Sequence, residues 1–437
     1  MDELERLRAD ILNKVDEYYR LSREQQLGTH ARKINYAGRV FDAEEMRNLT
    51  SAALEFWLTA GHWYHEFEHN MAEFLHTKEF LMVNSGSSAN LLAFMTLTQN
   101  ELGERRIKRG DEVIGVAAAF PTTVAPIVQF GAIPVFVDVL PNGNIDPDKL
   151  ELALSPKTKA VFIAHALGNP FNLDKVGEFC RRNNLWLIED NCDALGSTYR
   201  GKMTGTFGDL ATFSFYPPHH ITTGEGGGVA TGNPELARIA RSLRDWGRDC
   251  VCPPGIDNKC GHRFDGQFGT LPRGYDHKYV YSHLGYNLKA TDMQAAIGYA
   301  QLKKLPIFIR KRRENFNFLK RELAELEHFF LLPEAEPHSD PSWFGFMMQV
   351  KPDAPFSRNE IVRHLEDNRI QTRNLFAGNL TRHPCWGGDF NFRIAGELIE
   401  TDRIMNSSFW IGVYPGLSGD DLHFMADTIK DFCRKFR

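Results

Sequence analysis

Residues 185–197 read LWLIEDNCDALGS, an apolar run that ends in two adjacent carboxylates. A run without polar interruption is typical of a strand that is buried on both faces of a parallel sheet. Open α/β sheets bind ligands at the carboxyl ends of their strands, which is where Glu189 and Asp190 lie in this segment. Asp190 could therefore pair with a protonated ring nitrogen of a cofactor or cap the following helix, and the segment alone favours neither.

The same alternation of apolar strand and helix recurs on both sides of this segment. Seven strands are expected, at 79–84, 111–118, 133–139, 159–166, 185–190, 211–216 and 227–231. Helical patterns separate them, for example at 87–99 and 174–184. This alternation predicts an α/β fold in which helices cover a large, mostly parallel, seven-stranded sheet. The C-terminal part of the chain predicts a smaller α/β domain.

We therefore divide the chain into three parts. Residues 1–36 are expected to form an N-terminal helical segment, 37–300 the large domain, and 301–437 a linker helix with the small C-terminal domain. The helical pattern of the linker is long, and Pro306 is a candidate break within it. Residues 246–285 are rich in Gly, Pro, Asp, Cys and Tyr and predict a long ordered loop. Long loops within compact domains are usually functional.

The composition is that of a soluble globular protein and excludes some classes of partner. The 437 residues carry a formal net charge of -5, which argues against nonspecific binding to nucleic acid. No apolar run reaches the ~20 residues that a membrane span requires. The acidic start, MDELERLRAD, is not a signal peptide, so we expect a cytoplasmic protein that contacts neither nucleic acid nor membrane. In that compartment the seven cysteines are not expected to form disulfides.

Two further motifs lie where strands end. In VNSGSSANLLAF (83–94) a strand passes through small residues into a helix, whose free N–H groups and dipole suit a phosphate. Such a turn more often binds nothing. In ATFSFYPPHHITTGEGGGV (211–229) a strand leads into two adjacent histidines and a glycine-rich turn. The histidines could ligate a metal, but neighbouring side chains seldom face the same way, so an ordinary loop is the better interpretation.

Taken together and in this order, the three motifs resemble those of the sugar-nucleotide aminotransferases, which are fold-type I enzymes dependent on pyridoxal phosphate. The resemblance covers most of the chain and implies how the cofactor is held. Gly86, Ser87 and Ser214 match the family's phosphate-binding positions. Phe120, in GVAAAFPTTVAP, matches the aromatic residue that stacks on the pyridine ring. Asp190 matches the aspartate that bonds the ring nitrogen.

The lysine of this family, which bonds the cofactor aldehyde, should stand five residues after Ser214, and His219 occupies that position. No lysine lies between Lys202 and Lys259, so a small misalignment cannot restore it. Histidine cannot bond the aldehyde, but it can accept and donate protons near neutral pH. The resemblance therefore implies pyridoxamine phosphate, held noncovalently, and dehydration at C3 of a nucleotide-linked 4-keto-sugar. Asp193 could assist this proton transfer or serve only as a cap or polar support.

Other segments supply candidates for the partner subunit and for the substrate. Asn287, in NLKATDMQAAIG, matches a family asparagine that reaches toward the neighbouring subunit's cofactor, which implies a homodimer. Thr59 and Gly61, in WLTAGHWYHEFE, are candidate substrate contacts, as is Arg373 in QTRNLFAGNL.

Four cysteines form a constellation of their own: Cys192, Cys250, Cys252 and Cys260. Four thiolates can hold a [2Fe–2S] cluster or a structural zinc ion, and the residues alone favour neither. Their spacing is, however, similar to that of the CDP-4-keto-6-deoxyglucose 3-dehydrase family, as are the stretches SLRDWGRDC, SDPSWFGF and LFAGNLTR. This second resemblance favours the iron–sulfur cluster.

The same resemblance implies the whole reaction. The substrate is expected to be CDP-4-keto-6-deoxy-D-glucose, with electrons from a flavin- and [2Fe–2S]-bearing NAD(P)H reductase, in 3,6-dideoxysugar and O-antigen (lipopolysaccharide) biosynthesis. No local motif separates a CDP-sugar from a dTDP-sugar, so the latter stays an alternative. A sugar-nucleotide aminotransferase with a displaced lysine and a non-catalytic sensor of zinc or sugar nucleotide are further alternatives.

Overall fold

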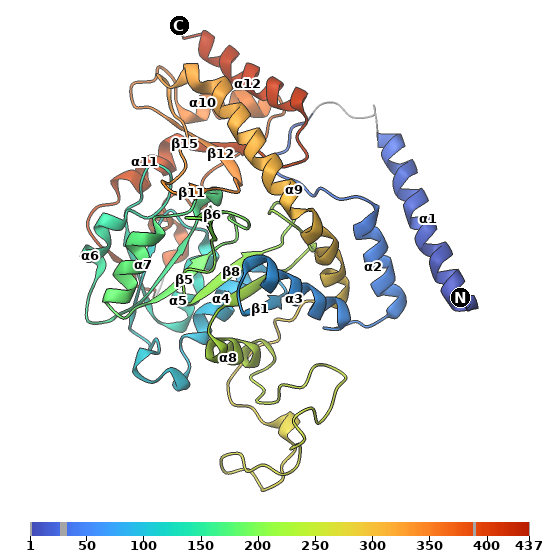
Figure 1. Ribbon diagram of the computed structural model, residues 1–437. Coiled ribbons are helices and arrows are strands. Elements are labelled where there is room, and N and C mark those ends of the chain that lie inside the picture. The colour runs from blue at the N-terminus through green and yellow to red at the C-terminus, as the bar shows by residue number, and fades with distance from the viewer. Residues whose placement is uncertain (1, 27–32, 388–389, 437) are drawn as a thin grey trace.

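The computed structural model describes residues 2–26, 33–387 and 390–436. A large sheet with helices packed against it forms the body, and a smaller sheet with its own helices lies beyond it (Figure 1). The helices are α1 Glu3–Gln26, α2 Ala43–Glu55, α3 His62–Leu75, α4 Gly86–Thr96, α5 Pro121–Phe130, α6 Leu150–Ala153, α7 Leu173–Arg182, α8 Pro234–Arg244, α9 Asp292–Leu323, α10 Arg358–Asp367, α11 Ile399–Ser407 and α12 Gly419–Arg434. The strands are β1 Glu79–Val83, β2 Glu112–Val116, β3 Ile133–Val137, β4 Thr158–Ala164, β5 Trp186–Asp190, β6 Thr198–Tyr199, β7 Lys202–Met203, β8 Leu210–Ser214, β9 Gly227–Thr231, β10 Phe330–Leu331, β11 Ser339–Asp340, β12 Gly345–Val350, β13 Thr372–Arg373, β14 Arg393–Ile394 and β15 Ser408–Gly412.

The large sheet has the strand order β1-β9-β8-β5-β4-β2-β3-β14. Only β9 runs against the common direction, since its pairings with β1 and β8 are both antiparallel. The prediction of a large, mostly parallel sheet is therefore confirmed, and the seven expected strands all belong to it. An eighth strand, β14, pairs in parallel with the β3 edge. At two residues it is too short to leave a pattern in the sequence.

The central strands are apolar throughout because each of their residues faces a packed layer. Val113 and Phe162 belong to a core that includes α4 and α8, on one face of the sheet. Ile114 and Ile163 belong to a core on the other face, which includes α7. Successive residues of a strand point to opposite faces. A strand covered on both sides therefore needs apolar residues at every position, which is the pattern seen in the sequence.

A single long helix joins the large sheet to the small one. α9 spans 32 residues and begins with a capping box at Thr291. It runs through Pro306 without interruption, so the expected break is not formed. The small sheet, in the order β10-β12-β15-β13, is antiparallel and packs with α10 and α12. The expected N-terminal helix is α1, and the three-part division of the chain stays a prediction. No helix in the described ranges is long and apolar enough to cross a bilayer.

Residues 246–285, called the arm below, connect the end of α8 to the segment before α9. Figure 1 shows the arm projecting away from the large sheet and the helices that cover it. Isolated backbone bridges close its base, between Asp245 and Asn287 and between Arg248 and Tyr281. Beyond the base it consists of turns and one short 3-10 helix, His277–Tyr279. The structure describes residues 246–285 as a long loop, and its assignment to the large domain stays a prediction.

Candidate active site

A cavity of about 500 Å³ opens at the carboxyl ends of β4, β5 and β8. Strand ends of this kind are where open α/β sheets bind ligands. Nine of the residues singled out in the sequence line this cavity: Gly86, Ser87, Phe120, Asp190, Cys192, Asp193, Ser214, His219 and Arg373. Six others lie elsewhere: Thr59, Gly61, Cys250, Cys252, Cys260 and Asn287. Five stretches that are far apart in the chain thus meet at one place.

The turn between β1 and α4 forms an anion cradle at one end of the cavity. Ser85 caps α4, and its hydroxyl accepts a hydrogen bond from the Ser88 N–H at 3.0 Å. Gly86 opens the helix against the end of β8, where an added methyl group would lie 2.6 Å from Cβ of Ser214. Only glycine allows this close approach. A helix N-terminus beside a serine hydroxyl suits a phosphate group, so these residues fit the phosphate of a pyridoxal-type cofactor.

Asp190 is fixed at the end of β5 by a polar network. Its Oδ2 atom accepts hydrogen bonds from Asn90 Nδ2 at 3.0 Å and from Thr123 Oγ1 at 2.7 Å. Asn90 is itself held by the Thr212 hydroxyl, at 2.6 Å from its Oδ1 atom. The carboxylate is buried yet lines the cavity, so it fits the ring nitrogen of the same cofactor. Asn90 could have been found as a polar residue within an otherwise apolar helical pattern, whereas no sequence signal marks Thr123.

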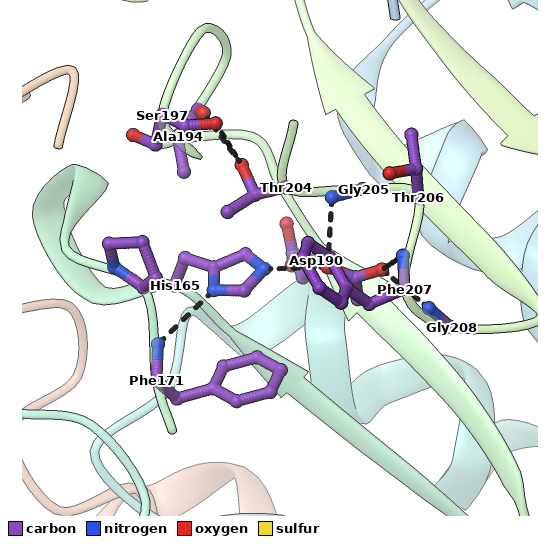
Figure 2. Close-up of polar contacts among 12 residues, drawn as sticks. His165, Phe171, Asp190, Ala194, Ser197, Thr204, Gly205, Thr206, Phe207 and Gly208 are labelled. Carbon is purple, nitrogen blue, oxygen red and sulfur yellow. Dashed lines mark hydrogen bonds and ion pairs between the residues drawn. The ribbon is translucent and has the colours of Figure 1, made fainter. Parts of the chain in front are cut away.

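Glu189, the neighbouring carboxylate, points to the opposite face of the sheet and serves the fold. Its two oxygens accept backbone N–H groups of Gly205, Phe207 and Gly208 at 2.8, 2.7 and 2.7 Å. His165 Nε2 lies 3.0 Å from Oε2 of this carboxylate. Figure 2 shows His165, Gly205, Phe207 and Gly208 around this end of the strand. Burial alone would raise the pKa of Glu189, but His165 and these backbone hydrogen bonds lower it overall. This network ties the loop after β7 to the strand that carries Asp190.

His219 and Asp193 face each other across the cavity wall, with Nδ1 of the histidine 3.5 Å from Oδ1 of the aspartate. Burial raises the pKa of the Asp193 carboxyl to about 8, and nearby Asp190 adds to this rise while Arg312 opposes it. Burial lowers the pKa of His219 to about 4, although Asp190 acts in the opposite direction. At neutral pH the imidazole is therefore neutral and the Asp193 carboxyl mostly protonated.

Two atoms of this pair are buried without a partner. Asp193 Oδ2 and His219 Nδ1 have no hydrogen-bond partner among the described residues. Buried polar atoms are seldom left unpaired, so the pair is suited to a bound group that can donate or accept protons. Arg312, from the distant helix α9, donates from Nη2 to the His219 carbonyl oxygen at 3.2 Å. No local pattern in the sequence pointed to Arg312.

The outer wall of the cavity is aromatic. Phe120 and Tyr216 keep about half of their surface exposed there, at 51% and 50%. Arg373 lies at the same wall, with its guanidinium carbon 3.9 Å from the centre of the Tyr36 ring. An exposed aromatic ring and a cation suit the base and phosphates of a nucleotide. Tyr216 follows Ser214 by two residues and was missed in the sequence.

Thr59 and Gly61 lie outside this cavity and hold helix ends together. The Gly61 N–H donates to Asp292 Oδ1 at 3.0 Å, and the Thr59 carbonyl accepts the Asp292 N–H at 3.1 Å. These bonds connect the start of α3 to the start of α9. The predicted substrate contacts of Thr59 and Gly61 stay predictions, as does the reach of Asn287 into a second subunit.

The four cysteines fall at two places in the chain. Cys192 lines the active cavity, whereas Cys250, Cys252 and Cys260 line a separate small cavity within the arm. Each arm sulfur accepts a backbone N–H, with N–S distances of 3.4, 3.3 and 3.4 Å for Cys250, Cys252 and Cys260. Hydrogen bonds of this kind favour the thiolate form of a cysteine. The described part of one chain does not gather three or more His, Cys, Asp or Glu side chains into a metal site.

The fold and the cavity define a class of protein. A mostly parallel sheet, with an anion cradle and a fixed carboxylate at its carboxyl edge, is the architecture of the vitamin B6-dependent aminotransferases. The chain belongs to the DegT/DnrJ/EryC1/StrS aminotransferase family, which it matches over residues 40–430.

Several relatives are similar over nearly the whole chain. The lipopolysaccharide biosynthesis protein RfbH of Salmonella typhimurium is 54% identical over 397 residues, which cover 91% of each protein. The dTDP-4-dehydro-2,6-dideoxy-D-glucose 3-dehydratase of Saccharopolyspora spinosa is 50% identical over 426 residues, 97% of this chain and 92% of that protein. Among solved structures, E. coli GDP-4-keto-6-deoxy-D-mannose-3-dehydratase with bound hydrated PLP superposes with a TM-score of 0.83, at 28% identity, covering 92% of this chain and 100% of that one.

Proposed function

We propose that this protein is a cytoplasmic, vitamin B6-dependent enzyme that removes the C3 hydroxyl of CDP-4-keto-6-deoxy-D-glucose, in 3,6-dideoxysugar and O-antigen biosynthesis. One observation carries the proposal. His219 stands in a cavity that has an anion cradle and a fixed carboxylate, and no lysine is among the described residues that line it. Transamination needs an amine that bonds the cofactor aldehyde, which imidazole cannot do.

The residues that line the cavity would hold each part of pyridoxamine phosphate. Gly86, Ser87 and Ser214 would hold its phosphate, Phe120 would stack on its ring, and Asp190 would keep its ring nitrogen protonated. When bound, it would supply the amine that condenses with the substrate ketone and a ring that accepts electrons.

The protein residues then move protons. His219 would accept a proton from the cofactor C4′ methylene. Burial lowers its pKa to about 4 and so keeps it neutral, and its Nδ1 atom has no hydrogen-bond partner in the described residues. Asp193, with a pKa of about 8, can give a proton to the C3 hydroxyl as it leaves. The two groups lie 3.5 Å apart, so a proton could pass between them after each turnover. Arg312 would hold the His219 backbone in place during these transfers.

Reduction of the dehydrated sugar is the second part of the proposal. Cys192, Cys250, Cys252 and Cys260 would hold a [2Fe–2S] cluster, and a flavin- and iron–sulfur-bearing NAD(P)H reductase would supply electrons. The N–H···S bonds to the arm sulfurs support this assignment. The enzyme would act as a homodimer, with Asn287 directed to the second subunit. A cluster fits this set better than structural zinc because Cys192 lines the cavity in which the reaction occurs.

Substrate choice has a second candidate. A relative at 50% identity is named for a dTDP-linked 4-dehydro-sugar, so a dTDP-4-keto-sugar could replace the CDP-sugar. Arg373 and the exposed Tyr216 would contact either nucleotide, and neither side chain distinguishes cytosine from thymine.

An anaerobic assay of both sugars tests this function. The protein, loaded with pyridoxamine phosphate, should remove oxygen from C3 of CDP-4-keto-6-deoxyglucose faster than from C3 of the dTDP-sugar. Iron and sulfide are quantified in the same sample, and both should be present. A faster dTDP reaction would support the second candidate. Glutamate-dependent amination without loss of oxygen would identify an aminotransferase. Binding of sugar nucleotide or zinc without turnover would identify a sensor.

A further inference from the structure

The four predicted cluster ligands do not lie together in the described part of one chain. Cys192 and the three arm cysteines line two cavities that share no residue. Each arm sulfur accepts a hydrogen bond from a backbone N–H, but the described residues of one chain do not gather the three sulfurs into a metal site. A [2Fe–2S] cluster is held by four thiolates, so the arm lacks one ligand. A second chain is one source of the fourth thiolate.

The base of the arm is fixed, so its direction is a property of the fold. Ser242 and Glu101 hold His283 from two sides, through contacts of 2.8 Å to Nδ1 and 2.7 Å to Nε2. Gly247 allows the two segments at the base of the arm to pack closely. A methyl group added at Gly247 would lie 2.0 Å from the His283 carbonyl oxygen. These contacts direct the arm away from the large sheet (Figure 1).

The arm carries apolar side chains that nothing in one chain covers. Leu284 is 95% exposed and Phe264 is 58% exposed, and Tyr279 and Tyr281 are more than half exposed as well. Exposed apolar side chains on a projecting loop are available for contact with a second chain. The mouth of the active cavity has the complementary feature, because Tyr216 is half exposed there. A second copy of the chain therefore offers both an apolar contact and the missing thiolate.

We propose that the cluster is shared between two copies of this chain. The arm of one chain would bring Cys250, Cys252 and Cys260 to the Cys192 of the other, at the mouth of that subunit's active cavity. A two-fold axis makes this exchange reciprocal, so a dimer holds two identical clusters. Each cluster would then lie beside Asp190 and His219 of the subunit that it serves. This inference rests on the homodimer and the [2Fe–2S] cluster of the proposed function.

Mixed dimers test the inference without an activity assay. A chain with Cys192→Ala and a chain with Cys252→Ala are co-expressed with different affinity tags, and the mixed dimer is purified through both tags. If the cluster is shared, the intact arm of the first chain meets the intact Cys192 of the second. The mixed dimer should then contain half the iron and sulfide of the wild type, with the visible absorption of a [2Fe–2S] centre. If each chain holds its own cluster, the mixed dimer should contain none.

A reciprocal pair gives the opposite result and guards against misfolding. Wild-type chain paired with the Cys192→Ala/Cys252→Ala chain should contain no cluster if the site is shared, and half the wild-type content if it is not. Half occupancy in this pair, with none in the first, would overturn the shared cluster while leaving the proposed function intact. A wild-type dimer that binds no iron, or a wild-type chain that is monomeric by sedimentation, would overturn the proposed function as well. A cluster formed only with the reductase bound would assign the fourth ligand to that partner.

Discussion

The active cavity and the arm hold reactive side chains in two different ways. In the cavity, Asp190 and His219 are buried and come from separate segments that the large sheet brings together. In the arm, three cysteines come from eleven consecutive residues and lie on a loop that reaches away from the body. The cavity is built by the tertiary fold, whereas the arm is built locally.

The two regions therefore differ in what sets the chemistry of their side chains. The polar groups of the cavity have their pKa values shifted by burial, so their chemistry belongs to the folded chain. The sulfurs of the arm receive hydrogen bonds from their own loop. Changes in the cavity should therefore alter both stability and chemistry, and changes in the arm should alter chemistry with little effect on folding.

The largest expected effect is that of His219→Asn. Dehydration should fall by about 10²–10⁴-fold, because a general base is lost, while binding of pyridoxamine phosphate stays close to that of the wild type. Single-turnover dehydration and equilibrium dialysis of the cofactor measure the two quantities. If the variant no longer binds cofactor, His219 has a structural role and is not the general base.

Gly86→Ala tests the tight construction of the cradle. The added methyl group would meet Cβ of Ser214 at 2.6 Å, so unfolding free energy should fall by about 1–3 kcal/mol and phosphate binding should weaken. Gly177→Ala is the matched control, since its methyl group meets nothing within 4 Å. Urea unfolding of both variants gives the comparison. If Gly86→Ala has the same unfolding free energy as the wild type, the cradle relaxes around the added methyl group and is not rigid.

Asp193→Asn tests the buried carboxyl through pH. The folded pKa of Asp193 is about 8 and an unfolded aspartate has a pKa of about 3.9. Between these values the unfolded chain releases a proton that the folded chain keeps, so this residue makes the wild type less stable as pH rises. The Asn variant lacks this decline. Its advantage in unfolding free energy should grow by at least about 1 kcal/mol from pH 5 to pH 8, and parallel curves would show that Asp193 is not perturbed.

The smallest expected effect on folding is that of Cys252→Ala in the arm. Iron and sulfide should be lost together with the reduction step, while dehydration by His219 continues and the unfolding free energy of cofactor-loaded, cluster-free protein changes by less than about 0.5 kcal/mol. Cys385→Ala, an exposed cysteine outside both cavities, is the control and should keep the cluster. Reduction that survives in the Cys252 variant would show that electrons take another route.

Much of the cavity could be predicted because its residues end strands with a clear apolar pattern. Asp190, Ser214 and the Gly86 turn each follow a buried strand, and parallel strands place their carboxyl ends along one edge. Thr123 and Arg312 could not be predicted in the same way. They reach Asp190 and His219 from α5 and α9, and no local pattern records which helix packs against which strand end.

The sequence by itself determined the seven main strands, the family and the replacement of lysine by His219, because these depend on the order and spacing of residues along the chain. Only the tertiary structure decided that Glu189 supports the fold while Asp190 faces the cavity, that Thr59 and Gly61 lie outside it, and that Cys192 is separated from the arm. The physical reason is that distances between remote segments are fixed by packing, hydrogen bonds and burial, which arise only when the chain has folded.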